Sequence, residues 1–157
     1  MESIVRKISK GLPMFASLLL LPVLLFCSCE SAFPNDELDN FWKLKRIEYL
    51  GGTDLFGQPA QSVDAKGVYF GLARTIIQIE NHPRGFDVYG MFDDMGDSIR
   101  FDFTDSRIDG IHNAAYIQEN LRYCGVDSLV TVFKVNSLNS TKMVLSTGKV
   151  RLNFEKW

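Results

Sequence analysis

The sequence alternates between apolar and charged side chains at Ile99-Arg100-Phe101-Asp102-Phe103, and this stretch decides the class of fold. Because successive side chains of a β-strand point to opposite faces, the three apolar residues share one face, and Arg100 and Asp102 share the other. The same pattern returns in residues 142–146 and 150–155. Each segment is therefore predicted to be a strand with one buried face and one solvent-exposed face.

Four further segments are strand-like, and they run from Trp42 to Leu50, Val68 to Ile79, Phe86 to Phe92 and Leu129 to Val135. In the first, the apolar residues change parity, which a β-bulge near Arg46 would reconcile. The second is long, and Gly71 within it indicates a bulge or a sharp bend. The fourth is apolar on both parities, which predicts that both of its faces are covered.

Turns and one helix connect these strands. Turn sequences that contain glycine occur at residues 81–85, 93–97 and 147–149. One segment has helical periodicity, because Ile117, Leu121 and Cys124 follow one another at i, i+4 and i+7. Asn113 can cap the start of this helix, and Gly125 stands where the helix would end.

The length and composition favour one domain. The chain has 157 residues, of which 46% are hydrophobic, so it can bury one packed core. Seven or eight short antiparallel strands, with one short helix near the C-terminal strands, predict an all-β fold. A small antiparallel up-and-down β-barrel is the most economical arrangement, since it also removes the exposed edges of an open sheet.

The first thirty residues have the pattern of a bacterial lipoprotein signal. A cationic start precedes an apolar run from Met14 to Phe26. As a helix this run would rise about 20 Å, short of the roughly 30 Å hydrocarbon core of a bilayer. Phe26-Cys27-Ser28-Cys29 then resembles the lipobox, in which a small residue precedes the lipidated cysteine. We expect lipidation at Cys29. Cys27 is the rival acceptor, and an ordinary secretory signal is the alternative.

These features divide the chain into a signal peptide (1–28), a lipid-anchored tether (29–40) and a barrel domain (41–157). Residues 29–157 carry 14 Lys and Arg against 18 Asp and Glu, a net charge of −4. This acidic balance disfavours nucleic acid as a partner, because phosphates require a basic surface. The membrane is the expected partner, through the anchor. A signal for export to the cell surface would place several acidic residues directly after the lipidated cysteine. Here Glu30 alone directly follows Cys29, so outer-membrane location at the periplasmic face is favoured over the cell surface.

Few residues have the spacing that catalysis or metal binding requires. His82 and His112 lie in loop contexts without a partner at a ligand spacing, and the acidic turn at residues 93–97 lacks the ligand order of a calcium loop. No nucleophile motif or phosphate-binding glycine loop is present. Cys124 is expected to be a small buried apolar residue. No catalytic residue, metal site or cofactor is therefore predicted.

Both ends of the barrel domain resemble a known family. Asn40-Phe41-Trp42-Lys43-Leu44 is similar to the opening strand of lipocalin-like proteins, in which Gly-x-Trp places a tryptophan at the closed end of the barrel; here Asn40 replaces the glycine. The final hairpin (142–156) and the ending Lys156-Trp157 resemble lipocalin-like, calycin-type lipoproteins of Bacteroides-type bacteria. The resemblance implies a lipocalin-like barrel with Trp42 as its plug. It also implies an arginine over the plug, but strict alternation points the candidate, Arg151, to solvent unless the last strand bulges.

The expected function is a non-enzymatic envelope lipoprotein that binds a small hydrophobic molecule. The residues expected to contact it from the barrel interior are Trp42, Phe101, Phe103, Leu152 and Phe154. Apolar burial would supply most of the affinity, since no charge lies among them. The alternative is a protein-interaction lipoprotein, an envelope assembly accessory or an inhibitor, whose barrel is a filled scaffold. An aromatic-lined void would favour the first function, and a filled barrel with an exposed apolar patch would favour the second.

Two tripeptides are candidate modification sites. Asp97-Ser98-Ile99 and Asp127-Ser128-Leu129 match the pattern that Bacteroides-type bacteria use for O-glycosylation. Both tripeptides also fit the entrances of strands. Ser98 and Ser128 are therefore candidate acceptors of a glycan, and unmodified strand entrances are the alternative.

Overall fold

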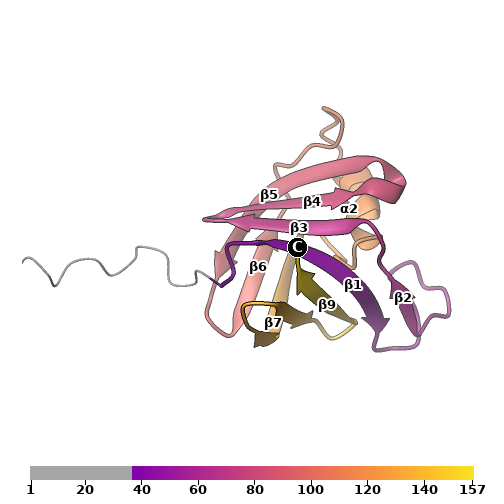
Figure 1. The fold of residues 1–157 in the computed structure, drawn as a ribbon. Helices are drawn as coiled ribbons and strands as arrows, with labels where there is room; N and C mark the ends of the chain where they lie inside the picture. The colour runs from indigo at the N-terminus through magenta and orange to yellow at the C-terminus, as the bar shows by residue number, and fades with distance from the viewer. Residues whose placement is uncertain (1–36) are drawn as a thin grey trace, which may run out of the picture. The chain divides into compact units, whose positions relative to one another are not determined.

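The computed structural model describes residues 37–157, which form a closed antiparallel β-barrel (Figure 1). Eight strands make the barrel in the order β1-β3-β4-β5-β6-β7-β8-β9, and β9 pairs with β1 to close it. A further short strand, β2, is hydrogen-bonded to β1. The strands are β1 (Phe41–Tyr49), β2 (Ser62–Asp64), β3 (Val68–Ala73), β4 (Ile76–Asn81), β5 (Phe86–Asp94), β6 (Ser98–Asp102), β7 (Val130–Leu138), β8 (Lys142–Ser146) and β9 (Val150–Lys156). The predicted barrel is confirmed. The expected signal peptide and Cys29 lie outside the described residues.

Strand β1 contains the bulge that its sequence predicts. Its pairing with β9 matches Leu44 to Phe154 and then Arg46 to Asn153, so the register shifts between Leu44 and Arg46. The extra residue allows apolar side chains on both sides of the bulge to reach the interior, where Leu44 and Ile47 are both fully buried. Without it, one half of the strand would turn its apolar residues to solvent.

The helix α2 (Ala114–Arg122) connects β6 to β7, as the sequence predicts. Asn113 is its N-cap, and the side-chain oxygen of Asn113 accepts a hydrogen bond from the Tyr116 backbone N–H at 3.0 Å. After the last turn Gly125 adopts a φ of 82°, which a glycine adopts at low cost. Figure 1 shows α2 at the end of the barrel where β1 ends and β2 lies.

A short 3-10 helix, η1 (His82–Arg84), forms the turn between β4 and β5. Within residues 37–157, none of the helices has the length and apolar character needed to cross a membrane.

The segment from Val68 to Ile79 is a hairpin, so the prediction of one long strand with a bulge or sharp bend at Gly71 is wrong. The turn between β3 and β4 is Arg74-Thr75. Arg74 has a φ of 59°, and its backbone N–H donates a hydrogen bond to Asp39 Oδ1 at 3.0 Å. A contact from 35 residues earlier in the chain therefore stabilises a turn that contains no glycine, asparagine or proline. Gly71 keeps a regular register in β3. It lies under the ring of Phe41, where a Cβ would come within 2.6 Å of Phe41 Cε2.

Strand β7 is covered on one face, so the prediction that both faces of residues 129–135 are covered is also wrong. Thr131 and Phe133 point inward and are buried, whereas Val130 and Val132 are 38% and 50% exposed on the outer face. Both arrangements produce an apolar run in the sequence. Parity alone cannot distinguish a strand buried on both faces from a strand with an apolar outer surface.

Candidate functional site

The barrel interior gathers the five residues that the sequence predicts as ligand contacts. They are Trp42, Phe101, Phe103, Leu152 and Phe154, and all are buried. Neighbouring strands bring aromatic rings together around them: the ring centroids of Phe101 and Phe133 lie 5.3 Å apart, and those of Phe70 and Phe154 lie 4.9 Å apart. The five residues thus form one core, and contact with a ligand stays a prediction.

One end of the barrel is closed by Trp42 together with Leu38. The Trp42 ring is fully buried, and its Nε1–H donates a hydrogen bond to the Leu38 backbone oxygen at 3.1 Å. This bond satisfies the polar atom of the indole, which buried tryptophan requires. Leu38 precedes the predicted start of the barrel at residue 41, yet its side chain belongs to the hydrophobic core. The chain therefore covers this end before β1 begins.

The opposite end is closed by α2 and the residues that follow it. Leu121, Cys124 and Val126 are fully buried. The Asn81 side-chain amide, at the end of β4, donates a hydrogen bond to Cys124 Sγ at 3.4 Å. A Cβ on Gly125 would collide with the Cδ2 atom of Leu152 in β9, so the backbone after α2 packs directly on the barrel interior.

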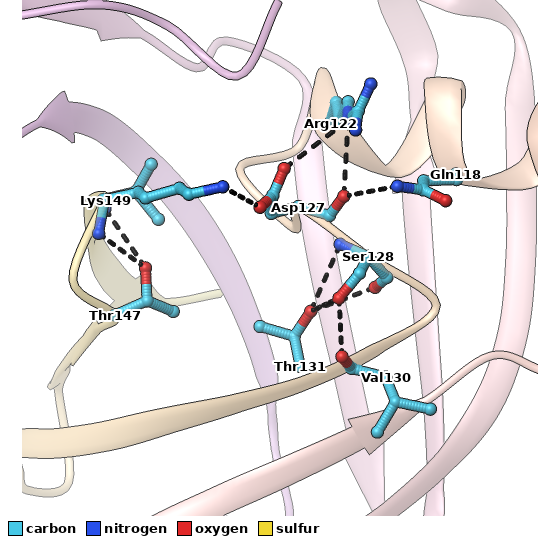
Figure 2. A network of polar contacts seen from close by, with 9 residues as sticks. Gln118, Arg122, Asp127, Ser128, Val130, Thr131, Thr147 and Lys149 are labelled. Carbon is cyan, nitrogen blue, oxygen red and sulfur yellow. Dashed lines mark hydrogen bonds and ion pairs between the residues drawn. The ribbon is translucent and has the colours of Figure 1, made fainter.

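Polar contacts around Asp127 attach α2 to the strands (Figure 2). Asp127 Oδ2 accepts a hydrogen bond from Lys149 Nζ at 2.6 Å, and Asp127 Oδ1 lies 3.5 Å from Arg122 Nε. The next residue, Ser128, places its Oγ 3.2 Å from Thr131 Oγ1 in β7. The end of the helix is therefore connected both to β7 and to the turn between β8 and β9.

Burial gives the thiol of Cys124 a pKa of about 12. Because the thiolate is the reactive form, we expect this thiol to resist iodoacetamide at about pH 8 in the native protein and to react in concentrated guanidinium. Mass spectrometry of the labelled peptide assigns the reaction to Cys124. Labelling of the native protein as fast as of the unfolded protein would mean that this end of the barrel opens in solution.

The interior is filled by side chains. A void large enough for a ligand would leave exposed area on the residues that line it, yet the five predicted contact residues are between 0% and 3% exposed. Three polar side chains are buried in the described part of the chain, namely Asn81, Ser106 and Thr131. Each of them has a hydrogen-bond partner. The core is thus a close-packed protein interior.

Charged strand residues point outward, as the alternation predicts. Arg100 forms ion pairs with Asp93 at 3.0 Å and with Asp102 at 2.6 Å. Hydrogen bonds from Thr104 to the Asp102 carboxylate, together with the nearby Arg100, hold the pKa of Asp102 below its usual value. Arg151 forms an ion pair on the outside, 3.3 Å from Glu48. Arg151 therefore does not cover the tryptophan plug.

A surface pocket of about 400 Å³ lies over the outside of α2. Its lining residues are Phe56, Ala115, Gln118, Glu119 and Arg122. Beside the pocket, the ring centroids of Phe56 and Tyr123 lie 4.5 Å apart, and the Arg84 guanidinium lies 3.0 Å from the centre of the Tyr123 ring. No local sequence pattern marks this pocket, because it forms between a loop and a helix that are distant in the chain. It lies outside the barrel core.

The outer face of β4 to β7 carries exposed apolar side chains, which we call the outer apolar patch. Its members are Ile76, Tyr89, Met91, Val130 and Val132, and each is 38–52% exposed. The register places Ile76 opposite Met91 and continues through Asp102 to Val130. The ion pair of Arg100 with Asp102 lies within the patch, between its members on β5 and its members on β7. The sequence signal for this surface was the second apolar parity of β7.

The histidines and the acidic turn have local structural partners. His82 Nε2 lies 3.1 Å from Glu80 Oε2, and His112 Nδ1 lies 2.8 Å from the Ser106 backbone oxygen. In the turn after β5, the carboxylate of Asp94 accepts a hydrogen bond from a backbone N–H at 2.8 Å. Among residues 37–157, no three His, Cys, Asp or Glu side chains are grouped in a way that could hold a metal ion.

The chain matches a family model and two solved structures. Residues 24–157 match the model of the lipocalin-like domain. A lipocalin-like protein from Bacteroides uniformis is 16% identical, with a TM-score of 0.57, over 77% of this chain and 99% of that protein. An uncharacterized protein from Bacteroides eggerthii is 19% identical, with a TM-score of 0.52, over 76% of this chain and 99% of that protein. At these identities the two structures show a shared fold. No curated protein sequence matches this chain. Because the family model covers most of the sequence, the chain belongs to the lipocalin-like domain family.

Proposed function

We propose that this chain is a non-enzymatic, lipid-anchored protein of the bacterial envelope whose filled barrel binds another protein through the outer apolar patch. The lipid would be attached to Cys29 and would hold the barrel at the periplasmic face of the outer membrane. The lipocalin-like family is generally non-enzymatic, and both structurally similar proteins come from Bacteroides. Glycosylation of Ser98 or Ser128 stays a prediction.

The filled interior carries this proposal. An eight-stranded barrel has an interior just wide enough either to be filled by side chains or to hold one small ligand. Here the rings of Phe70, Phe101, Phe133 and Phe154 pack on one another, and both barrel ends are covered. A ligand in the interior would have to displace buried side chains. The protein-interaction alternative from the sequence is therefore the function that the geometry supports best.

The outer apolar patch has the composition of a binding surface. Protein interfaces are enriched in aromatic residues, Met and Arg, with an apolar centre and a polar rim. The patch contains Tyr89 and Met91, and the outward-facing Arg100 and Asp102 of β6 lie between Met91 and the two valines of β7. The outward-facing charged residues of β4 to β7 are Glu80, Asp87, Asp93, Asp102, Arg100 and Lys134, which leaves the surface net acidic. We therefore expect a protein partner with an apolar surface and a basic rim.

Photo-crosslinking in cells tests this function. With the photoreactive residue benzoylphenylalanine in place of Tyr89, we expect one adduct of defined mass with a different protein. The adduct should disappear when Met91→Lys is added, because a buried lysine costs several kcal/mol and a basic rim repels it.

A matched control is benzoylphenylalanine at Val63 in β2, which is as exposed as the patch but lies beside β1. This position should give no such adduct. Equal adducts from both positions, or none from position 89, would contradict the proposal. An adduct with a second copy of this chain would show that the outer apolar patch mediates self-association and would contradict binding to a different protein.

Binding of a small hydrophobic molecule is the second candidate function, and membership of the lipocalin-like family favours it. An apolar interior without a fixed charge should bind a neutral probe better than an anionic one of equal size. The filled barrel predicts that neither a fluorescent fatty acid nor its methyl ester binds at micromolar concentration, and that native mass spectrometry detects no copurified ligand. Saturable binding of the ester, with one molecule per chain, would establish this second function. A preference for the free acid that is lost in Arg151→Ala would contradict the apolar-interior hypothesis.

A further inference from the structure

An aromatic cluster lies on the outer face of β1, β3 and β9, on the opposite side of the barrel from the outer apolar patch. Its members, which we call the terminal aromatic cluster, are Phe41, Tyr69 and Trp157. Trp157 is 69% exposed, and its ring meets Tyr69 edge-on with the centroids 4.8 Å apart. The strand order is a ring of eight in which β1 and β6 are four strands apart, so the two apolar surfaces face away from each other.

The exposed tryptophan has a fixed position. The Trp157 backbone N–H donates a hydrogen bond to the Phe41 backbone oxygen at 2.8 Å, which extends the β1–β9 pairing to the last residue. Gly71 in β3 has no side chain, so the Phe41 ring lies across it and stacks with Tyr69. Lys43 Nζ lies 5.4 Å from the centre of the Trp157 ring. A large indole is therefore held at the surface without being buried.

Two basic residues of β1 lie on the same outer face as the exposed indole. Lys43 lies beside the indole and Lys45 lies further along the strand, whereas Lys156 pairs with Trp42 and has the opposite parity. Glu155 is the acidic residue on this part of β9, and it forms an ion pair with Lys45 at 3.1 Å. The combination of tryptophan and lysine suits the headgroup region of a bilayer, where an indole has one apolar and one polar side and lysine meets anionic lipid.

The short chain between the expected lipid anchor and the barrel also favours the membrane as the partner of this surface. Cys29 and Glu37 are eight residues apart, so an extended chain allows at most about 28 Å between them. A domain of this size is about 35 Å across. A lipid on Cys29 would therefore keep the end of the barrel at which β1 begins close to the bilayer, and that end carries Phe41 and Trp157.

We propose that the terminal aromatic cluster, with Lys43, rests on the headgroup region of the membrane to which Cys29 anchors the chain. This inference depends on the lipid anchor of the proposed function. The barrel would then lie with β1 and β9 against the lipid, and the outer apolar patch on β4 to β7 would face away from the membrane, where a protein partner can reach it.

The two tryptophans of the chain provide a direct test, since Trp42 is fully buried and Trp157 is exposed. The lipidated full chain is reconstituted in vesicles of phosphatidylcholine and phosphatidylglycerol, with and without phosphatidylcholine brominated near the headgroup. Because an indole at headgroup level contacts the bromine atoms, we expect the Trp157 emission, obtained as the difference between wild type and Trp157→Phe, to fall about twofold. The emission of Trp157→Phe itself, which comes from Trp42, should not change. Lys43→Glu should reduce the quenching.

Failure of the anchor and failure of the membrane contact give different results. Cys29→Ala should leave the protein in the soluble fraction without diacylglycerol, and Cys27→Ala should change little. Covalent lipid that persists in Cys29→Ala would refute the anchor at Cys29. A wild-type lipoprotein that is bound to vesicles but shows no quenching of Trp157 would overturn the membrane contact and leave the anchor intact. A protein adduct from benzoylphenylalanine at position 157 would then assign this surface to a protein instead.

Discussion

Replacing Trp42 with alanine is expected to lower the free energy of unfolding by about 3–5 kcal/mol, the usual cost of deleting a large buried aromatic side chain. The indole is fully buried at the end of the barrel, and its loss removes both its packing and the hydrogen bond to the Leu38 oxygen. Chemical denaturation of the variant and the parent measures the difference.

The second tryptophan serves as the matched control. Trp157 is largely exposed, so Trp157→Ala should cost about 1 kcal/mol or less. In Trp157→Phe the only indole is Trp42, and acrylamide should quench its emission in the unfolded protein but not in the native protein. A native Trp42 that acrylamide reaches freely, or a Trp42→Ala variant as stable as the parent, would count against the plug.

The sequence was most informative where local pattern and tertiary structure agree. Alternation at residues 99–103 and 150–155 correctly predicts which side chains point into the barrel, because a strand with one buried face has a period of two. The change of parity in β1 correctly predicts the bulge near Arg46. Asn113 also marks the start of α2, since capping depends on the backbone of one or two residues. The helix ends at Arg122, three residues before the predicted end at Gly125.

The wrong predictions concern features that the local sequence pattern does not determine. The β3–β4 turn depends on Asp39, which accepts a hydrogen bond from the Arg74 backbone, and nothing within the hairpin marks that turn. The outer apolar patch produced an apolar run in β7 that looked like a second buried face. Whether the barrel is filled also depends on where α2 packs, and a list of inward-facing residues does not contain that information.

Gly125 offers the test of that packing. Gly125→Ala is expected to destabilise the protein by about 2–5 kcal/mol, the sum of two costs. An alanine with positive φ costs about 1–2 kcal/mol, and the collision of its Cβ with Leu152 adds about 1–3 kcal/mol of overpacking. Leu152 has little freedom to move away, because it is fully buried in the barrel core. Chemical denaturation again provides the measurement.

Gly96→Ala separates the two costs. Gly96 also has a positive φ, 88°, but a Cβ there meets no atom within 4 Å, so this variant should lose only the backbone contribution of about 1–2 kcal/mol. Leu152→Ala should then remove the extra penalty at Gly125, giving a cost of Gly125→Ala in that background close to the cost of Gly96→Ala. If the two glycine variants are equally stable in the parent background, the segment after α2 does not pack closely against Leu152 in solution. The barrel would then be open at that end, and the ligand-binding function would replace the filled scaffold as the better proposal.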